Sequence, residues 1–482
     1  MPGQNHTTND TMTGPKHSCG VVGIAAAYNV VQALHKTLMI IQHRGQESAG
    51  ITVFKEGGDM QTVKDNGLVQ LALSTDKIAR MDGNVGIGHV KYSAVGQKNV
   101  INAQPLTVTT SFGVVAIAHN GNITNYKELK EKYLSTGTSF LTDSDSELAT
   151  KILSKYMIQT GDPIKSMKNM MLELEGAYAL TIMINDRLFG VRDPYGFRPL
   201  CIGRIGEGYM IVSESAAIDA LNGTFERDVA PGEIVEVMKD QFVSYQGIAS
   251  KHKAYCMFEW VYFARPDSAM DGREVYAVRK KIGEILAREC PADVDMIMPI
   301  PDSGRAHAIG FSIASGIPYE EGFMKNRFAE RTFILPDQKE REAAVSMKMN
   351  PIKSTVEGKR MVIVDDSIVR GTTLKKLIQM LRNAGAKEVH VRIGCPPVIA
   401  PCYYGVDMKT RDQFVATGRS TEEVCKIIGA DSLGCISIEG LIEAIEKPES
   451  ELCLACVNGK YPTRIPGEVQ RFQSKLILEE YS

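Results

Sequence analysis

The 482-residue sequence contains no run of about 18 apolar residues, which is the length that a membrane-spanning helix needs. It also lacks a strong charge of either sign, because 55 lysines and arginines nearly balance 57 aspartates and glutamates. A near-neutral chain lacks the electrostatic footprint of proteins that bind nucleic acids or anionic membranes. These absences predict a soluble protein whose partners are small molecules, with no nucleic acid and no membrane among them.

The first 18 residues are almost wholly polar and contain no apolar core of the kind found in secretory signals. A segment so poor in apolar groups cannot offset its ordering entropy, so we expect residues 1–18 to be disordered or removed. Without a secretory signal, the ten cysteines are expected to be reduced thiols of a cytoplasmic protein, where catalytic or metal-binding roles are more common than disulfides.

Internal repeats and long low-complexity tracts are also missing, and the chain is too long for one ordinary hydrophobic core. From Cys19 to about Val243, short apolar runs typical of strands mix with amphipathic helices, which predicts an α/β layered domain. No sustained period runs from about Ser244 to Asp271, so we place a domain boundary there. Beyond it, apolar strands such as Met296–Ile300 alternate with helices, as a parallel sheet requires.

An acidic pair follows an apolar strand in Met361–Thr373, which reads MVIVDDSIVRGTT. Ligands of open parallel sheets bind beyond the carboxyl ends of the strands, and the helix behind Gly371 offers free amides to a phosphate. Asp365 and Asp366 would repel that phosphate, so they suit ribose hydroxyls and a hard cation such as magnesium. A simple acidic helix cap would explain neither the pair nor the Arg370–Thr373 run.

The same segment resembles the phosphoribosyl pyrophosphate motif of the type I phosphoribosyltransferases. The resemblance implies that the acidic pair meets the ribose hydroxyls and magnesium, and that the following loop holds the 5-phosphate. The turn at Pro299–Gly304 offers Ser303 to pyrophosphate and its metal. The polar stretch Asp337–Asn350 is expected to be a loop that closes over the site and excludes water. The implied magnesium ligands are Ser303, Asp365 and Asp366, and the further substrate-binding residues are Ser367, Arg370, Gly371, Thr372, Thr373, Lys325, Arg327, Arg331 and Lys348.

Cys19 begins the string CGVVGI directly after the polar leader. If the leader is cut before Cys19, a nucleophilic thiol and a free α-amino group lie on one residue, and an amine with a pKa of about 7.7 to 8 can act as the general base. A lone cysteine in an apolar strand is more often an inert core residue. Five further motifs favour the catalytic interpretation: HRGQESAGI at 43–51, GHVKYSAVG at 88–96, NAQPL at 102–106, AHNGNITN at 118–125 and TDSDSE at 142–147.

These motifs occur in the order seen in N-terminal-nucleophile glutamine amidotransferases, which this region resembles. The resemblance implies that the Asn120 side chain and the Gly121 amide form an oxyanion hole. It also implies that Arg44 and Lys91 bind the carboxylate of glutamine and that Asp145 binds its ammonium group. The family usually has arginine where this chain has Lys91, which keeps the charge but loses the two-pronged fork.

Cys453 and Cys456 form a C-x-x-C near the end of the chain, and Cys256 and Cys402 bring the number of available sulfurs to four. Sequence spacing alone does not separate tetrahedral zinc from a four-iron cluster or a redox pair. The contexts are similar to those of the amidophosphoribosyltransferases that are made with a short propeptide and bind a [4Fe-4S] cluster through four such cysteines. The remaining thiols, without such a context, are Cys201, Cys290, Cys395, Cys425 and Cys435.

The resemblance extends from residue 19 to about residue 465. It implies a propeptide at 1–18, an αββα N-terminal-nucleophile sandwich at 19–250, a type I phosphoribosyltransferase parallel-sheet domain at 251–440, and a tail at 441–482 with cluster-binding cysteines. The implied reaction makes 5-phosphoribosylamine from glutamine and phosphoribosyl pyrophosphate, as the first committed step of purine synthesis. A cytoplasmic homotetramer, inhibited by purine nucleotides and activated as a glutaminase by phosphoribosyl pyrophosphate, is also implied.

Two alternatives belong to other classes. One is a regulatory protein that binds phosphoribosyl pyrophosphate and has lost glutaminase chemistry, against which the intact glutamine motifs argue. The other is an amidotransferase that acts on a sugar phosphate, which would need a sugar isomerase half in place of the VIVDDSIVRGTT string.

Overall fold

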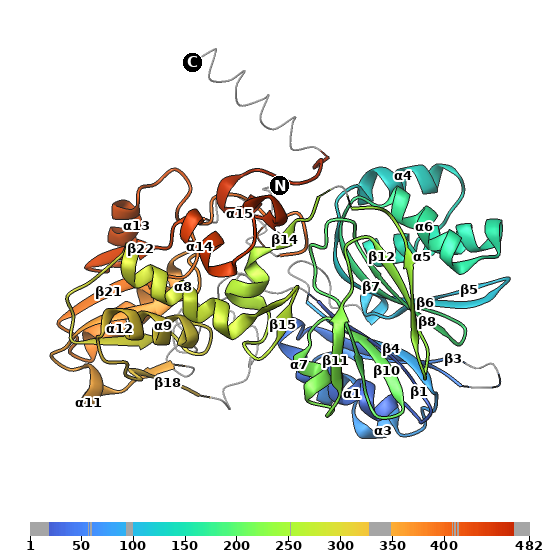
Figure 1. Ribbon diagram of the computed structural model, residues 1–482, viewed down its shortest axis with the longest axis horizontal. Coiled ribbons are helices and arrows are strands. Elements are labelled where there is room, and N and C mark those ends of the chain that lie inside the picture. Colours follow the sequence, from blue (N-terminus) through green and yellow to red (C-terminus); the bar gives the residue numbers. More distant parts are fainter. Residues whose placement is uncertain are drawn as a thin grey trace, which may run out of the picture. The chain divides into compact units, whose positions relative to one another are not determined.

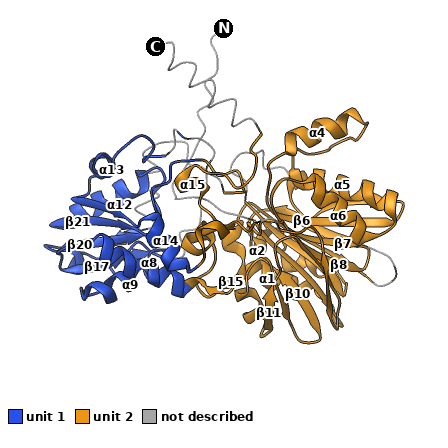
Figure 2. Ribbon diagram, turned by 45° about the horizontal axis from the view of Figure 1, so that its top comes forward, with its two compact units in different colours: residues 1–15, 276–400, 410–446 blue, residues 16–275, 401–409, 447–482 orange. Residues whose placement is uncertain are grey.

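The computed structural model describes residues 19–55, 57, 60–92, 100–250, 252–326, 349–406, 408, 411 and 414–466. These residues form two compact units, each of which collects separate stretches of the chain (Figure 2). The amino-terminal unit falls within Lys16–Val275, Pro401–Lys409 and Lys447–Ser482, and the second unit falls within Tyr276–Ala400 and Thr410–Glu446. The sequence predicts continuous domains that divide at 250 and 440, whereas the compact units divide at 275 and 446, and residues 401–409 belong to the amino-terminal unit.

Two antiparallel sheets form the centre of the amino-terminal unit (Figure 1). In the order of strand pairing, the first sheet contains β11 (Thr224–Asp228), β9 (Cys201–Arg204), β10 (Gly208–Val212), β1 (Gly20–Ala26), β4 (Val85–Lys91), β2 (Ser48–Phe54) and β3 (Met60–Asn66). The second contains β13 (Phe242–Gln246), β12 (Glu233–Val237), β8 (Arg187–Arg192), β7 (Gly176–Ile184), β6 (Gly113–Ile123) and β5 (Leu106–Thr110).

Helices cover the outer face of each sheet. Those against the first sheet are α1 (Val31–Ile40), α2 (Val69–Ala72), α3 (Thr75–Ile78) and α7 (Ala216–Asp219), and those against the second are α4 (Tyr126–Ser135), α5 (Asp145–Thr160) and α6 (Pro163–Glu173). Short 3-10 turns lie at η1 (Gln42–Arg44) and η2 (Val100–Asn102). One cluster of buried apolar side chains fills the space between the two sheets, and two more fill the spaces between each sheet and its helices. This order of layers confirms the predicted αββα sandwich.

The second unit contains a parallel sheet in the order β17 (Met296–Pro299), β20 (Arg360–Asp365), β21 (Glu388–Ile393) and β22 (Ser432–Cys435). Its helices are α8 (Val275–Glu289), α9 (Arg305–Ser315), α11 (Lys353–Val356), α12 (Thr372–Asn383), α13 (Thr421–Ile428) and α14 (Ile438–Ile445), and a small ribbon pairs β18 (Phe323–Lys325) with β19 (Met349–Pro351). The alternation of parallel strands and helices agrees with the predicted phosphoribosyltransferase fold.

Several short elements complete the amino-terminal unit, and one pair of them joins segments that are far apart in the sequence. Strand β14 (Tyr255–Cys256) pairs in parallel with β23 (Leu452–Cys453), and β15 (Ala269–Met270) pairs with β16 (Arg273–Glu274). The π-helical turn η3 (Glu259–Phe263) follows β14, while η5 (Glu449–Glu451) and α15 (Ala455–Asn458) flank β23. No helix in the described ranges has both the length and the apolar character needed to span a membrane.

Candidate active sites

Cys19 lies immediately before strand β1, at the start of the described chain. Its half-buried thiol points at the carbonyl oxygen of Tyr92, 3.9 Å from Sγ. Burial raises the pKa of the Cys19 thiol, and the positive charge of Lys91 and the negative charge of Asp145 also act on it. The structure therefore brings these three predicted residues into one electrostatic neighbourhood, in which the thiol needs a base to remove its proton.

Asn120 and Gly121 lie side by side on strand β6. The Asn120 side chain is 0% exposed, and neither its Oδ1 nor its Nδ2 has a hydrogen-bond partner among the described residues. Gly121 has a φ of 143°, and a Cβ atom on it would lie 2.1 Å from the Ala177 carbonyl oxygen. A buried amide without a hydrogen-bond partner lowers the stability of the folded state by about 1–3 kcal/mol. Asn120 and Gly121 are therefore suited to bind an oxygen atom of a ligand, which would supply the missing partner.

Asp145 is the first residue of α5, where the positive end of the helix dipole favours a carboxylate. Its Oδ2 accepts a hydrogen bond from the Ile123 amide at 3.1 Å, and its Oδ1 lies 3.5 Å from Nδ1 of His119. Burial by itself would raise the pKa of Asp145, but His119 and the Ile123 amide hold that pKa below its usual value. The carboxylate is therefore charged at neutral pH, as binding an ammonium group requires.

His119 is a site residue that the sequence interpretation missed. Its backbone amide donates to Oε1 of Gln104 at 2.7 Å, and its carbonyl oxygen lies 3.0 Å from Nε2 of His89. The His119 side chain contacts Asp145, and His119 is the residue directly before Asn120 in the sequence. The AHNGNITN motif contained this histidine, but only the fold shows that one residue supports both the carboxylate and the oxyanion strand.

Lys91 ends strand β4, and its Nζ donates to the Asn102 carbonyl at 2.8 Å. Lys64 braces the same segment, because its Nζ donates to the Ala103 carbonyl at 2.7 Å and to the Pro105 carbonyl at 3.2 Å. Two ammonium groups thus converge on the NAQPL motif. This arrangement leaves Lys91 with further hydrogen-bond donors for a carboxylate, since an ammonium group has three.

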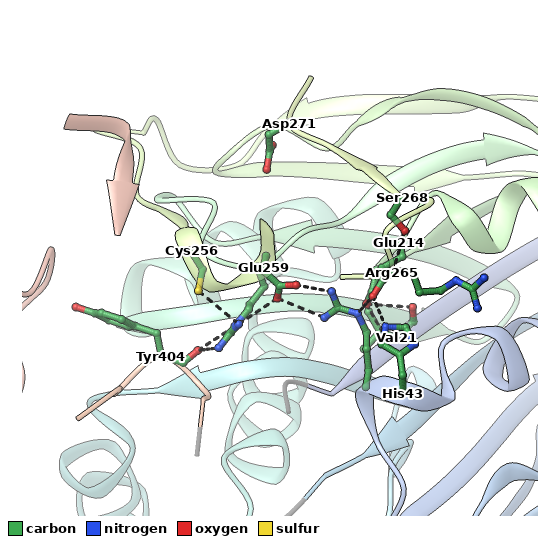
Figure 3. Close-up of polar contacts among 12 residues, drawn as sticks. Val21, His43, Glu214, Cys256, Glu259, Arg265, Ser268, Asp271 and Tyr404 are labelled. Atoms are coloured by element: carbon green, nitrogen blue, oxygen red, sulfur yellow. Dashed lines mark hydrogen bonds and ion pairs between the residues drawn. The ribbon is translucent and has the colours of Figure 1, made fainter. Parts of the chain in front are cut away.

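Arg44, the other predicted carboxylate partner, lies in a buried ion network with Glu214 and Glu259, which Figure 3 labels. Its guanidinium pairs with Glu214 through Nε and with Glu259 through the terminal nitrogen Nη2, and its side chain is 0% exposed. Glutamine could be bound through Arg44 only if this network opened, so that role stays a prediction. Glu214 also accepts hydrogen bonds from the Arg265 amide at 2.8 Å and the Ser268 hydroxyl at 2.9 Å.

The four cysteines predicted to bind a cluster all belong to the amino-terminal unit. Cys256 and Cys453 are direct neighbours in the β14–β23 ladder, Cys402 packs with Cys453 in one apolar cluster, and Cys456 follows on α15. Burial raises the pKa of the Cys256 thiol to about 11, and the charges of Glu259 and Cys402 add to the effect. None of the described cysteines forms a disulfide.

The arrangement of these thiols bears on which metal group would fit. Among the described residues, no three histidine, cysteine, aspartate or glutamate side chains are grouped so that they could hold one metal ion. Cys402 and Cys453 share one apolar cluster, and Cys256 is the ladder neighbour of Cys453. Thiolate sulfurs are ligands of both zinc and iron–sulfur clusters, so this donor set fits either group.

The acidic pair of the second unit lies at the carboxyl end of the central strand β20. The Ser367 hydroxyl donates to Asp366 at 2.6 Å, and the Ser303 hydroxyl also bonds this carboxylate. Burial and the charge of Asp366 raise the pKa of Asp365 well above its ordinary value. A cation or hydroxyl groups placed here would relieve that repulsion, and oxygen ligands are those that magnesium prefers.

Other residues predicted for this site have varied outcomes. Gly371 has a φ of 72° as the N-cap of α12, and Thr372 and Thr373 open that helix, so a helix N-terminus lies at the predicted position, while its contact with a phosphate stays a prediction. Lys325 ends β18, is exposed, and pairs with Asp302. Arg327, Arg331, Lys348, most of the predicted closing loop and the predicted propeptide lie outside the described residues.

Comparison with known proteins adds independent findings. The glutamine amidotransferase domain model matches residues 91–220, and the phosphoribosyl transferase domain model matches residues 273–395. An amidophosphoribosyltransferase of Methanocaldococcus jannaschii is 48% identical over an alignment of 464 residues, and the match covers 93% of this chain and 98% of the relative.

Two solved structures are similar over nearly the whole chain. The glutamine phosphoribosylpyrophosphate amidotransferase of B. subtilis, complexed with ADP and GMP, has a TM-score of 0.87 at 40% identity, with 93% of this chain and 98% of that chain covered. The structure described as the allosteric regulatory enzyme of purine biosynthesis has a TM-score of 0.88 at 40% identity, with 93% and 97% covered. The chain belongs to the amidophosphoribosyltransferase family.

Proposed function

We propose that this protein makes 5-phosphoribosylamine from phosphoribosyl pyrophosphate and glutamine, with release of glutamate and pyrophosphate, as the first committed step of purine synthesis. Family membership over nearly the full chain supports the reaction. The observation that carries the glutamine half is the buried Asn120 amide, whose polar atoms have no partner among the described residues, on the strand that also carries Gly121.

In the glutaminase step, the Cys19 sulfur attacks the amide carbon of glutamine and transfers its proton to the α-amino group that propeptide removal would expose. The amide oxygen becomes an oxyanion, which Nδ2 of Asn120 and the amide of Gly121 stabilise. Ammonia leaves with that proton, and water then hydrolyses the thioester to glutamate. Asp145 holds the ammonium group of the substrate and Lys91 its carboxylate, so both charged ends of glutamine are fixed.

In the transferase step, Asp365 and Asp366 meet the ribose hydroxyls, and the amides behind Gly371 hold the 5-phosphate. Ammonia attacks the anomeric carbon, and the bond to pyrophosphate breaks. Magnesium, bound by Ser303, Asp365 and Asp366 together with the substrate, would neutralise charge on the pyrophosphate. The buried carboxylates, whose mutual repulsion calls for a cation, support that assignment.

We place the protein in the subgroup that carries a propeptide and a [4Fe-4S] cluster. The ladder pairing of Cys256 with Cys453 and the packing of Cys402 with Cys453 support a sulfur-bound group, and the cysteine contexts that resemble those of this subgroup favour the cluster. Its proposed role is structural, because the reaction transfers no electrons. A cytoplasmic homotetramer and inhibition by purine nucleotides belong to the same proposal, and the relative solved with ADP and GMP supports the inhibition.

The reaction is tested with anaerobically purified protein by measuring glutamate release and pyrophosphate release, with and without phosphoribosyl pyrophosphate and magnesium. We expect glutamate release to rise with phosphoribosyl pyrophosphate. Cys19→Ser should abolish glutamine-dependent synthesis and keep synthesis from free ammonia, whereas Cys201→Ser should keep both. No glutamate release from correctly trimmed, iron-loaded protein would instead support a regulatory protein that binds phosphoribosyl pyrophosphate.

The cluster is tested by iron and acid-labile sulfide analysis of the same preparation. We expect about four irons per chain if a [4Fe-4S] cluster is present. Cys453→Ser should lower the iron content, and Cys425→Ser, on helix α13 of the other unit, is the matched control that should not. Stoichiometric zinc without iron would contradict the cluster.

A further inference from the structure

A segment from far along the chain lies against the oxyanion strand. Nδ2 of Asn122 donates to the Tyr403 carbonyl at 2.8 Å, although 281 residues separate the two in sequence. A Cβ atom on Gly405 would lie 3.0 Å from the carbonyl carbon and 3.1 Å from the α-carbon of Gly121. The backbone of Gly405 therefore packs directly on the peptide of Gly121.

Both glycines are required by this packing. Gly121 has a φ of 143° and Gly405 has a φ of 108°, and residues with a side chain rarely adopt such values. A Cβ atom at residue 121 would lie only 2.1 Å from the Ala177 carbonyl oxygen, so a side chain at this position would collide with strand β7. A displacement at residue 405 would be transmitted to the Gly121 peptide.

The segment is itself held rigidly by Arg198, which is 0% exposed. Nε and the terminal nitrogen Nη2 of Arg198 donate to the Tyr404 carbonyl at 3.0 and 2.7 Å, and Nη1 donates to Oε1 of Glu259 at 3.1 Å (Figure 3). The ring of Tyr404 stacks on Phe197 with centroids 4.1 Å apart. A buried two-pronged contact and a stacked ring leave residues 403–405 little freedom to move.

We propose that Cys402–Gly405 is a positioning segment of the glutaminase site, which holds the Gly121 peptide so that its N–H points at the oxyanion. The inference rests on the proposed function and adds a group of residues outside every glutamine motif. Its members touch neither substrate nor nucleophile and act through Gly121 and Asn122. Cys402 begins the segment, so a metal group bound by that thiol would anchor one end of it.

The first test compares two glycine variants. Gly405→Ala places a methyl group against the Gly121 peptide. Gly67→Ala is the matched control, because Gly67 has a nearly equal φ of 111° and a Cβ atom there would meet only Leu71, at 3.6 Å. Both variants therefore suffer similar backbone strain, and only Gly405→Ala adds a contact with the oxyanion strand, together with one at 3.1 Å from Nη2 of Arg198.

We expect Gly405→Ala to lower kcat for glutamine hydrolysis about 10- to 100-fold, somewhat less than complete loss of an oxyanion-hole donor. KM for glutamine should change less than about threefold, since Lys91 and Asp145 are untouched. Synthesis from free ammonia and the iron content should match the wild type. Gly67→Ala should match the wild type in all four measurements.

The second test does not depend on activity. Hydrogen–deuterium exchange of the peptide that covers residues 118–125 should accelerate in Gly405→Ala and stay unchanged in Gly67→Ala. If Gly405→Ala does not fold, Asn122→Ala, at an exposed side chain, should accelerate the same exchange and lower kcat in the same direction by a smaller factor.

The wild-type assay checks the proposed function separately from this inference. Wild-type protein without glutamine-dependent synthesis would overturn the proposed function, while the exchange comparison would still decide the role of the segment. Equal kcat values and equal exchange in the Gly405 and Gly67 variants would overturn the inference. So would a loss of ammonia-dependent synthesis as large as the loss with glutamine, because that pattern indicates general damage.

Discussion

Lys91 donates from Nζ to the Asn102 carbonyl at 2.8 Å and retains donors for the carboxylate of glutamine. A hydrogen bond to a charged group contributes about 1.5–3 kcal/mol, so Lys91→Met should raise KM for glutamine about 10- to 100-fold. Lys91→Arg should restore a two-pronged contact and keep KM equal or lower. Steady-state glutamate release measures both, with ammonia-dependent synthesis as the internal reference.

Lys64→Met is the matched control for this prediction, because Lys64 braces carbonyls of the same segment. If Lys64→Met and Lys91→Met raise KM equally, Lys91 acts by bracing the segment, and its direct contact with glutamine would be disproved.

Single residues were predictable from sequence where a motif combines chemistry with order along the chain. The Cys19 thiol lies within the electrostatic reach of Lys91 and Asp145, three residues that the ordered glutamine motifs single out. His119 and Glu259 were not predictable, because their importance depends on partners such as Arg44, 215 residues from Glu259. The partners of a buried ion pair have no regular spacing in the sequence, so only the folded structure shows which residues pair.

At the scale of elements, the network of Arg44, Glu214, Glu259 and Arg198 joins η1, the chain after β10, η3 and the chain after β8. Removing one partner of a buried charge pair leaves the other unpaired, which costs about 3–5 kcal/mol. Glu259→Gln should therefore destabilise the amino-terminal unit by about that amount. Trp260, the one tryptophan of the chain, is 1% exposed, so its fluorescence in urea reports the unfolding of this unit.

Glu128→Gln supplies the matched comparison. Glu128 pairs with Arg464 through two contacts at 3.3 and 2.6 Å, but the two side chains are 49% and 59% exposed. Solvent screens such a pair, so the same substitution should cost less than about 1 kcal/mol. Equal losses in the two variants would show that the buried network contributes no more than a surface pair.

Elements with a long apolar period were predictable, and very short ones were not. Leu374, Leu377, Ile378 and Leu381 recur at helical spacing in the sequence, and they are the buried residues of α12 (Thr372–Asn383), with Gly385 at a φ of 96° beyond its end. By contrast, β14 and β23 have two residues each and lie almost 200 positions apart. No local pattern predicts their pairing, because their partners are fixed by tertiary packing.

The same limit applies to the whole molecule. The sequence places the phosphoribosyl motif and Cys402 in one continuous domain, yet residues 401–406 and 447–466 fold with the amino-terminal unit. The amino-acid composition does not change at the point where the chain passes from the second unit back to the amino-terminal unit, so the sequence gives no sign of it. The amino-terminal core therefore includes residues from the last third of the sequence, such as Tyr404 and Cys453.

Each unit contains a deeply buried histidine that links its stability to pH. His89 in the amino-terminal unit and His307 in the other are both 0% exposed, and burial lowers the pKa of each to about 3. Nearby positive charges act in the same direction, from Lys91 on His89 and from Arg279 on His307. Both imidazoles are therefore neutral in the folded protein at any pH above that value.

In the unfolded chain these histidines bind a proton below a pKa of about 6.5. The unfolded state then holds more protons than the folded state, so stability is fully present above about pH 6.5 and falls progressively toward pH 3. Each pH unit below 6.5 lowers the free energy of unfolding by about 1.36 kcal/mol for each histidine. At pH 5 each histidine should therefore have lowered it by about 2 kcal/mol. Urea unfolding at pH 7.5, 6 and 5 measures the loss.

The glutamine side chain in the His307→Gln variant does not bind a proton. Between pH 7.5 and 5, the free energy of unfolding of its unit should therefore fall by about 2 kcal/mol less than in the wild type. Its stability at pH 7.5 sets the reference, which separates the effect of packing from that of titration. Identical pH profiles for wild type and His307→Gln would mean that acid destabilises this unit through carboxylates whose pKa is held low in the folded state, such as Asp302, because the raised pKa values of Asp365 and Asp366 have the opposite effect.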